Sequence, residues 1–195
     1  MKRSRIQMRA KLFNIYFETS FLSVAVMSAV LILDTSNRVV LCFISALIHE
    51  CGHLFAMYCF SIKPDSIKLR LFDIVINADT NKAFIPELII TLSGPMFNFV
   101  AAFVFFFFSK TLFVINLVIG VFNLLPIDTF DGGHALSLLL SLKFSFKTVR
   151  ATIKTLTFVF LVPIFIVGVL LLFYSKYNYS LLLISLYMVA VLFLK

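Results

Sequence analysis

Long runs of apolar residues, each close in length to a bilayer-spanning helix, dominate this chain. A hydrocarbon core about 30 Å thick needs about 20 mostly apolar residues in a helix. The pattern predicts an all-α polytopic membrane protein, with about six transmembrane helices forming a single membrane-embedded domain over residues 1–195. The expected spans are approximately 16–33, 39–60, 84–108, 112–126, 155–174 and 181–194. The fourth and sixth spans are short, so we expect them to tilt, to thin the bilayer or to lie inside the bundle.

The segment 62–82 has a different pattern. Apolar residues alternate first with Lys68 and Arg70 and then, in the opposite phase, with polar residues between 73 and 79. A period of two is typical of a β-strand. We therefore expect a short hairpin, or one broken strand, at the cytoplasmic membrane surface, and no sheet elsewhere in the chain.

Composition and charge support a membrane location. Hydrophobic residues make up 62% of the 195 residues and charged residues only 13%, with a mean hydropathy of +1.07. A soluble domain carries about 25% charged residues, so a soluble enzyme, a disordered chain and a disulfide scaffold are excluded. A cytoplasmic N-terminus would place 14 of the 17 Lys and Arg residues inside, including those of an expected loop at 143–154. The net charge of +8 therefore indicates membrane orientation rather than nucleic-acid binding.

The second expected span contains the sequence His49-Glu50-x-x-His53. Residues four apart share one face of a helix, so His49 and His53 can bind one metal ion. Glu50 can then reach a metal-bound water as a general base. In the alternative interpretation the histidines only bond to neighbouring helices, but ionisable side chains inside a membrane are costly and usually functional.

A catalytic zinc site normally has three protein ligands, and the residues leave the third one open. His134 or a carboxylate could supply it. Asp128 and Asp131 follow the fourth span at about the expected depth. Gly132 and Gly133 would let the backbone turn sharply and come close, which favours Asp131, with Asp128 second.

Two asparagines lie near the expected chemistry. Gly94-Pro95 should break or kink the third span. Asn98 and Asn123 could then bond to an extended substrate strand or to the scissile carbonyl. Alternatively, they only satisfy the backbone of a broken helix.

Three motifs together resemble the site-2 protease family of intramembrane zinc metalloproteases. The six-span plan is most similar to the bacterial subgroup that contains the sporulation sigma-factor-processing protease. The motifs are His49-Glu50-x-x-His53, Ser93-Gly94-Pro95-x-x-Asn98 and Asn123-Leu124-Leu125-Pro126-x-x-x-x-Asp131-Gly132-Gly133.

The resemblance implies one zinc ion with three protein ligands, His49, His53 and Asp131. It implies that Glu50 activates water and that Asn98 and Asn123 bind the substrate. The implied substrate is a membrane protein cleaved within or next to a transmembrane segment, in the bacterial cytoplasmic membrane with the active site toward the cytoplasm. Members of the subgroup often carry a nucleotide-sensing CBS domain and other relatives a PDZ domain, and we expect neither in this chain. Lipid is an implied partner and nucleic acid is not, while a membrane inhibitor or regulator, or a second copy of the chain, fits the resemblance.

Two other functions would also place ionisable residues in membrane helices or preserve such a site. A metal-ion transporter would also place His and Asp in membrane helices, but its ionisable groups should follow a path rather than cluster at one depth. A catalytically silent binding protein would be indicated by the loss of Glu50, which is present.

Overall fold

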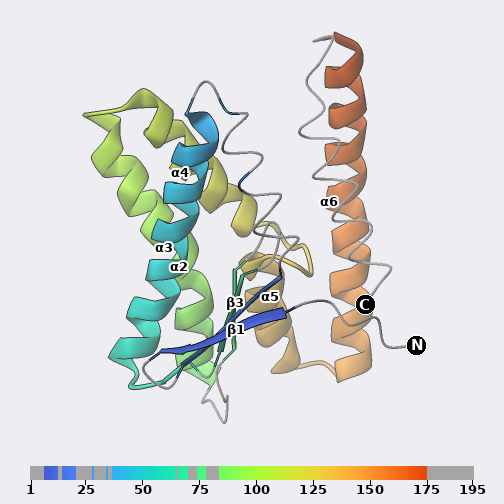
Figure 1. The fold of residues 1–195 in the computed structure, drawn as a ribbon. Coiled ribbons are helices and arrows are strands. Elements are labelled where there is room, and N and C mark those ends of the chain that lie inside the picture. The colour runs from blue at the N-terminus through green and yellow to red at the C-terminus, as the bar shows by residue number, and fades with distance from the viewer. Residues whose placement is uncertain are drawn as a thin grey trace. The chain divides into compact units, whose positions relative to one another are not determined.

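The computed structural model describes residues 7–12, 15–20, 28, 34, 37–64, 66–69, 74–77 and 84–174. These residues form five helices and four short strands (Figure 1). The chain divides into two compact units, Met1–Gly120 and Val121–Lys195.

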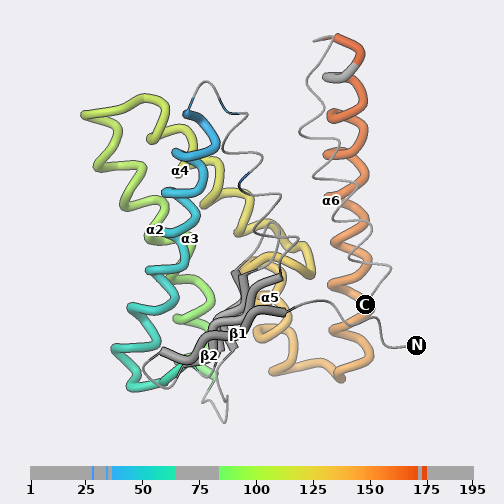
Figure 2. Tube along the Cα trace, viewed as in Figure 1, coloured from blue at the N-terminus to red at the C-terminus, as the bar shows by residue number. Residues whose placement is uncertain are grey.

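Helices α2 (Arg38–Cys59) and α3 (Phe84–Phe106) pack side by side in the first unit (Figure 2). Gly52 makes this close packing possible, because a Cβ atom there would lie 2.5 Å from the carbonyl oxygen of Ser93. Helix α4 (Lys110–Asn123) follows α3 after a short turn. The predicted spans 39–60 and 84–108 agree closely with α2 and α3, and the predicted span 112–126 corresponds to α4.

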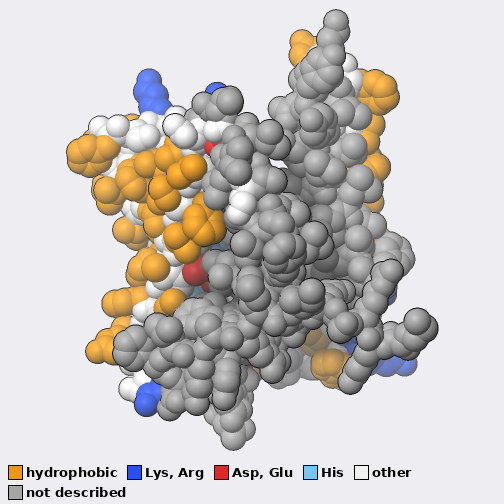
Figure 3. All heavy atoms as spheres, in the orientation of Figure 1, with side chains coloured by type: hydrophobic (Ala, Val, Ile, Leu, Met, Phe, Trp, Pro, Cys, Tyr) orange, Lys and Arg blue, Asp and Glu red, His pale blue; other side chains and the backbone are white. Residues whose placement is uncertain are grey.

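Among the described residues, three helices are long and apolar enough to cross a bilayer, namely α2, α3 and α6 (Phe146–Tyr174), and α4 is a shorter apolar helix. Large apolar side chains on these helices are exposed, among them Val100, Phe103 and Val118. Orange side chains gather over α2, α3 and α4 in Figure 3. An apolar outer surface of this kind is stable only in contact with lipid, so the chain is a multi-pass integral membrane protein.

Four strands of the first unit form one sheet in the order β1-β2-β3-β4. Strands β3 (Ser66–Leu69) and β4 (Ile74–Asn77) lie in the segment 62–82 and pair antiparallel. Strands β1 (Gln7–Leu12) and β2 (Ile15–Ser20) also pair antiparallel, and β2 pairs parallel with β3.

Strands β1 and β2 correct two expectations. The predicted span 16–33 cannot start as a helix at residue 16, and the sheet is not confined to the segment 62–82. Residues 15–20 are mainly aromatic or β-branched, which favours a strand, and their partner β3 is distant in the sequence. Nearly all of the remaining part of 16–33, and the whole predicted span 181–194, lie outside the described residues.

The second unit contains α5 (Asp131–Ser141) and α6, which pack against each other. Its apolar core is centred on Ile127 and Leu161. Helix α6 begins at Phe146, so the predicted span 155–174 starts too late, and most of the expected loop 143–154 is helical. Basic side chains at the end of a long apolar helix can extend toward the interface, so they do not end the helix.

Candidate metal centre

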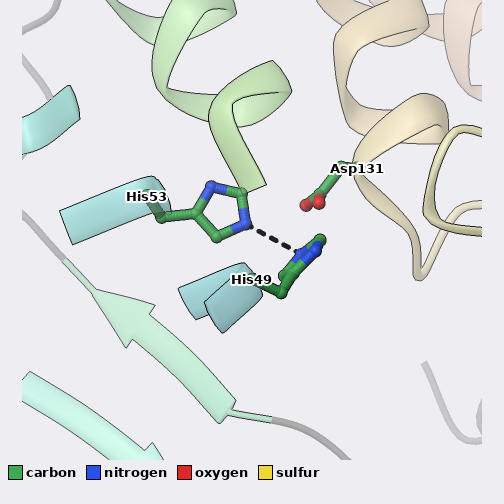
Figure 4. Close-up of side chains that lie close together, drawn as sticks. All are labelled: His49, His53 and Asp131. Carbon is green, nitrogen blue, oxygen red and sulfur yellow. Dashed lines mark hydrogen bonds between the residues drawn. The ribbon is translucent and has the colours of Figure 1, made fainter. Parts of the chain in front are cut away.

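His49 and His53 lie one turn apart on α2 and their side chains converge (Figure 4). The two Nε2 atoms are 3.1 Å apart. The ring centroids are 4.8 Å apart and the ring planes are nearly perpendicular, at 79°. His49 is only 6% exposed. The helical spacing therefore places both imidazoles at one point, as the motif predicts.

The other ring nitrogen of each histidine is held by the neighbouring helix α3. His53 Nδ1 donates to the carbonyl oxygen of Ile90 at 2.8 Å, since a carbonyl oxygen can only accept. His49 Nδ1 lies 2.6 Å from Oδ1 of Asn98. When a ring nitrogen donates from Nδ1, the neutral imidazole carries a lone pair on Nε2. The hydrogen bonds thus prepare both Nε2 atoms as ligands.

This arrangement fits a bound cation. Two lone pairs that face each other at 3.1 Å repel unless a positive charge lies between them. Two nitrogens bound tetrahedrally to one zinc ion at about 2.05 Å would be about 3.3 Å apart. The donor set and its spacing therefore agree with one zinc ion.

Gly94 lies directly against the two rings. A Cβ atom on Gly94 would be 2.7 Å from His49 Nε2 and 2.6 Å from His53 Cε1. The expected helix break is not found, because α3 continues through Gly94 and Pro95 as one helix. Membrane helices tolerate proline where neighbouring groups satisfy the freed backbone. The role of this glycine is to let α3 approach the histidines, and it was not predicted from the sequence.

Asn98 is completely buried, and its amide bonds within the protein. Besides the contact with His49, its Nδ2 donates to the carbonyl oxygen of Ser45 and to Oδ1 of Asn116, each at 3.0 Å. Both N–H groups of Asn98 are therefore used. Its observed role is to hold His49, and its binding to substrate stays a prediction.

Glu50 follows His49 on α2 and is partly buried. The carboxylate is thus carried by the same helical turn as the histidines, as the motif requires. The position of the Glu50 backbone follows from the helical spacing alone, because Glu50 and the two histidines belong to one continuous helix.

In the second unit, Asp131 is the first residue of α5 and its Oδ2 atom is buried. A carboxylate in the first turn is favoured by the helix dipole. Asp128 is exposed, and its backbone N–H donates to Thr157 Oγ1 of α6 at 2.9 Å. Asn123 ends α4 and is partly buried, while His134 is exposed on α5.

Gly132 and Gly133 correct a further expectation. Both are helical residues of α5, and no described glycine has a positive φ, so they do not make a sharp turn. They do allow a close approach. A Cβ atom on Gly132 would overlap the carbonyl oxygen of Leu124, and one on Gly133 that of Ile127. The glycines therefore pack the first turn of α5, with Asp131, tightly beneath the preceding segment.

Comparisons with known proteins found a sequence profile, a curated relative and a solved structure that are similar to this chain. The sequence profile described as peptidase family M50 matches residues 107–164. A zinc metalloprotease of Methanocaldococcus jannaschii is 31% identical in a match 123 residues long, and the match covers 55% of this chain and 35% of that relative. The chain thus spans about a third of the length of this curated relative.

A solved structure is similar over nearly the whole chain. It is a site-2 protease from Methanocaldococcus jannaschii, 25% identical, with a TM-score of 0.69 over 93% of this chain and 91% of that one. The profile match covers α4, α5 and the first part of α6, while the structural similarity extends to the helices with the histidines and Gly94. The chain is therefore a multi-pass membrane protein with the fold of a site-2 protease, and its residues 107–164 match the profile of peptidase family M50.

Proposed function

We propose that this protein is an intramembrane zinc metalloprotease that hydrolyses a peptide bond within or next to a transmembrane segment of another membrane protein. The observation that carries the proposal is the pair of Nε2 atoms 3.1 Å apart on an apolar helix, in which Glu50 directly follows His49. The family match and the zinc metalloprotease relative support the same activity.

We propose Asp131 as the third zinc ligand. The resemblance to site-2 proteases implies that Asp131 binds the same zinc ion as His49 and His53, and two histidines with one carboxylate are a common set for catalytic zinc. Asp131 has a buried carboxylate oxygen, whereas Asp128 is exposed. The tight packing of the first turn of α5 would hold that carboxylate in place.

When bound, zinc would polarise the scissile carbonyl and lower the pKa of water to about 7. Glu50 is the proposed general base, which takes a proton from the attacking water and delivers it to the leaving amine nitrogen. Asn123 and Asn98 are the proposed substrate-binding amides. Asn123 is the stronger candidate of the two, because both N–H groups of Asn98 already donate within the protein.

The substrate and its location are also proposals. The resemblance to the sporulation protease subgroup suggests a membrane-tethered transcription-factor precursor, cleaved in a bacterial cytoplasmic membrane with the active site toward the cytoplasm. The Lys and Arg distribution supports a cytoplasmic N-terminus. An unwound substrate could add to the sheet as a further strand, which would satisfy its backbone hydrogen bonds.

The variant Glu50→Gln tests this function. It preserves the shape of the side chain and removes the base, so it should abolish cleavage of a co-expressed single-span membrane substrate while zinc remains bound. Glu87→Gln, in the first turn of α3, is the matched control and should cleave normally. Elemental analysis of the detergent-purified proteins measures their zinc content, and His49→Ala serves as the control that should lose zinc. Cleavage by Glu50→Gln at the wild-type rate would show that the base has been assigned wrongly.

A further inference from the structure

A buried polar cluster joins the helices α2, α3 and α4 in the described part of the first unit. It consists of Ser45 on α2, Asn98 on α3 and Asn116 on α4, and each of these residues is 0% exposed. Polar side chains are costly in an apolar interior unless they are hydrogen-bonded. The metal centre described above requires only Asn98 of this cluster, so the presence of Asn116 calls for a separate explanation.

The orientation of the Asn116 amide follows from its partners. Its Nδ2 atom donates to the carbonyl oxygen of Leu112 at 2.9 Å and to Oγ of Ser45 at 3.0 Å. A backbone carbonyl oxygen can only accept, so the nitrogen of the amide must face Leu112. Oδ1 of Asn116 is therefore turned toward Asn98.

The same logic then fixes the Asn98 amide. The two atoms that face its Nδ2 are Oδ1 of Asn116 and the carbonyl oxygen of Ser45, and both are acceptors. Nδ2 must therefore point to them, and Oδ1 must point to Nδ1 of His49. His49 can meet this oxygen at 2.6 Å only with a proton on Nδ1, which leaves the lone pair on Nε2.

We propose that Asn116 is a positioning residue of the metal centre, which acts through Asn98 to hold His49 in the Nδ1–H tautomer with Nε2 turned toward His53. This inference rests on the proposed function, because positioning His49 matters only if a zinc ion binds there. The hydrogen bonds that set the tautomer are present without the metal. Helix α4 thereby takes part in the metal centre without supplying a ligand. Outer groups that orient a histidine ligand commonly change metal affinity by 10- to 100-fold when they are removed.

The experiment reads the tautomer directly in metal-free protein. The detergent-solubilised chain is labelled with ¹⁵N-histidine and recorded at a pH where the imidazoles are neutral. The chain has three histidines, so each signal can be assigned with single substitutions. His53 is an internal reference, because its Nδ1 donates to Ile90 O, outside the cluster.

In the wild type, both His49 and His53 should show the Nδ1–H tautomer. Asn116→Leu should reduce this preference at His49, leave His53 unchanged and lower zinc affinity about tenfold in a chelator competition. The same variant in an Asn98→Asp background should have no further effect on His49, because a carboxylate accepts from Nδ1 whichever way it turns. Should Asn116→Leu not fold, Asn116→Ala gives the same readout.

Two results would overturn the inference. One is a wild-type His49 without the Nδ1–H preference, and the other is an Asn116 variant in which His49 does not change or in which both histidines change equally. The tautomer is read without metal and without substrate. A protein that shows the expected tautomers but never binds zinc or cleaves would therefore refute the proposed function and not this inference.

Discussion

Replacing Gly94 by alanine tests whether the two histidines lie where the structure places them. The added methyl carbon would be 2.7 Å from His49 Nε2 and 2.6 Å from His53 Cε1, whereas ordinary contacts are 3.4–4 Å. The difference between 3.4 and 2.7 Å means that the rings or the helix must shift by about 0.7 Å. Metal–ligand distances vary by only about 0.2 Å, so the shift is several times larger than a zinc site tolerates.

The rings cannot move by this amount at no cost. Each is held by a short hydrogen bond, His49 to Asn98 and His53 to Ile90 O, and each bond contributes about 1 kcal/mol. Extra atoms in a packed interior cost a further 1–3 kcal/mol, roughly. We expect Gly94→Ala to bind zinc on the order of a hundredfold more weakly, which corresponds to about 2.7 kcal/mol.

Chelator competition measures the zinc affinity, and thermal unfolding in detergent checks the fold. The matched control is Gly120→Ala on α4, which is buried in the same unit. Its methyl carbon would be 3.0 Å from Phe99 Cε1 and 3.3 Å from Asn98 Cβ, a smaller overlap with side-chain atoms that can shift. The control should bind zinc normally. Wild-type zinc affinity in Gly94→Ala, with an unchanged unfolding temperature, would refute the proposed position of the histidines.

Three further predictions concern the second unit. Asp131→Ala should lower zinc occupancy and Asp128→Ala should not, as measured by elemental analysis; the reverse result would identify the other carboxylate as the ligand. Thr157→Val removes the hydroxyl that accepts from the backbone of Asp128, so it should cost about 1–2 kcal/mol of stability, seen as a lower unfolding temperature; an unchanged temperature would contradict that hydrogen bond. Gly133→Ala should displace the first turn of α5 from Ile127 O and reduce zinc occupancy, and full occupancy would show that this packing does not position the ligand.

The part of the site that is local in sequence could be predicted from the sequence. His49 and His53 are four residues apart, and any helix brings residues with this spacing to one face. The spans that became α2 and α3 follow from their apolar length alone. The place of Glu50 on α2 follows in the same way, because it depends only on the register of one helix, and its role as the base stays a prediction.

Contacts between elements could not be predicted in this way. Nothing in the spacing of Asn98 indicates that it meets His49, since this depends on how α2 and α3 cross. Asn116 was missed altogether, although a polar residue in an apolar helix is itself a signal. Gly94 was expected to break or kink its helix. Its observed role is to allow the close approach of two helices, which depends on how the helices pack and cannot be read from one segment.

The N-terminal strands β1 and β2 were not predicted, for a related reason. Strand β2 has a parallel partner in β3, which lies beyond the whole of α2 in the sequence, and such a pairing leaves no mark in a local window. The alternation in Gln7–Leu12 was present in the sequence, but the basic residues were attributed to membrane orientation alone.

The close crossing of α2 and α3 limits the routes by which a substrate can reach the metal centre. Gly52 on α2 touches the backbone of α3 at Ser93, and Gly94 on α3 touches the histidine rings of α2. Even one extended chain needs about 4.7 Å between neighbouring backbones, so it cannot pass between these helices at this level. The entrance must lie on another side of α2, and a covalent link between α2 and α3 near Gly52 should leave cleavage intact. In the first unit, the crossing of the two helices therefore closes one side of the histidine pair, and the proposed protease would have to admit its substrate from another side.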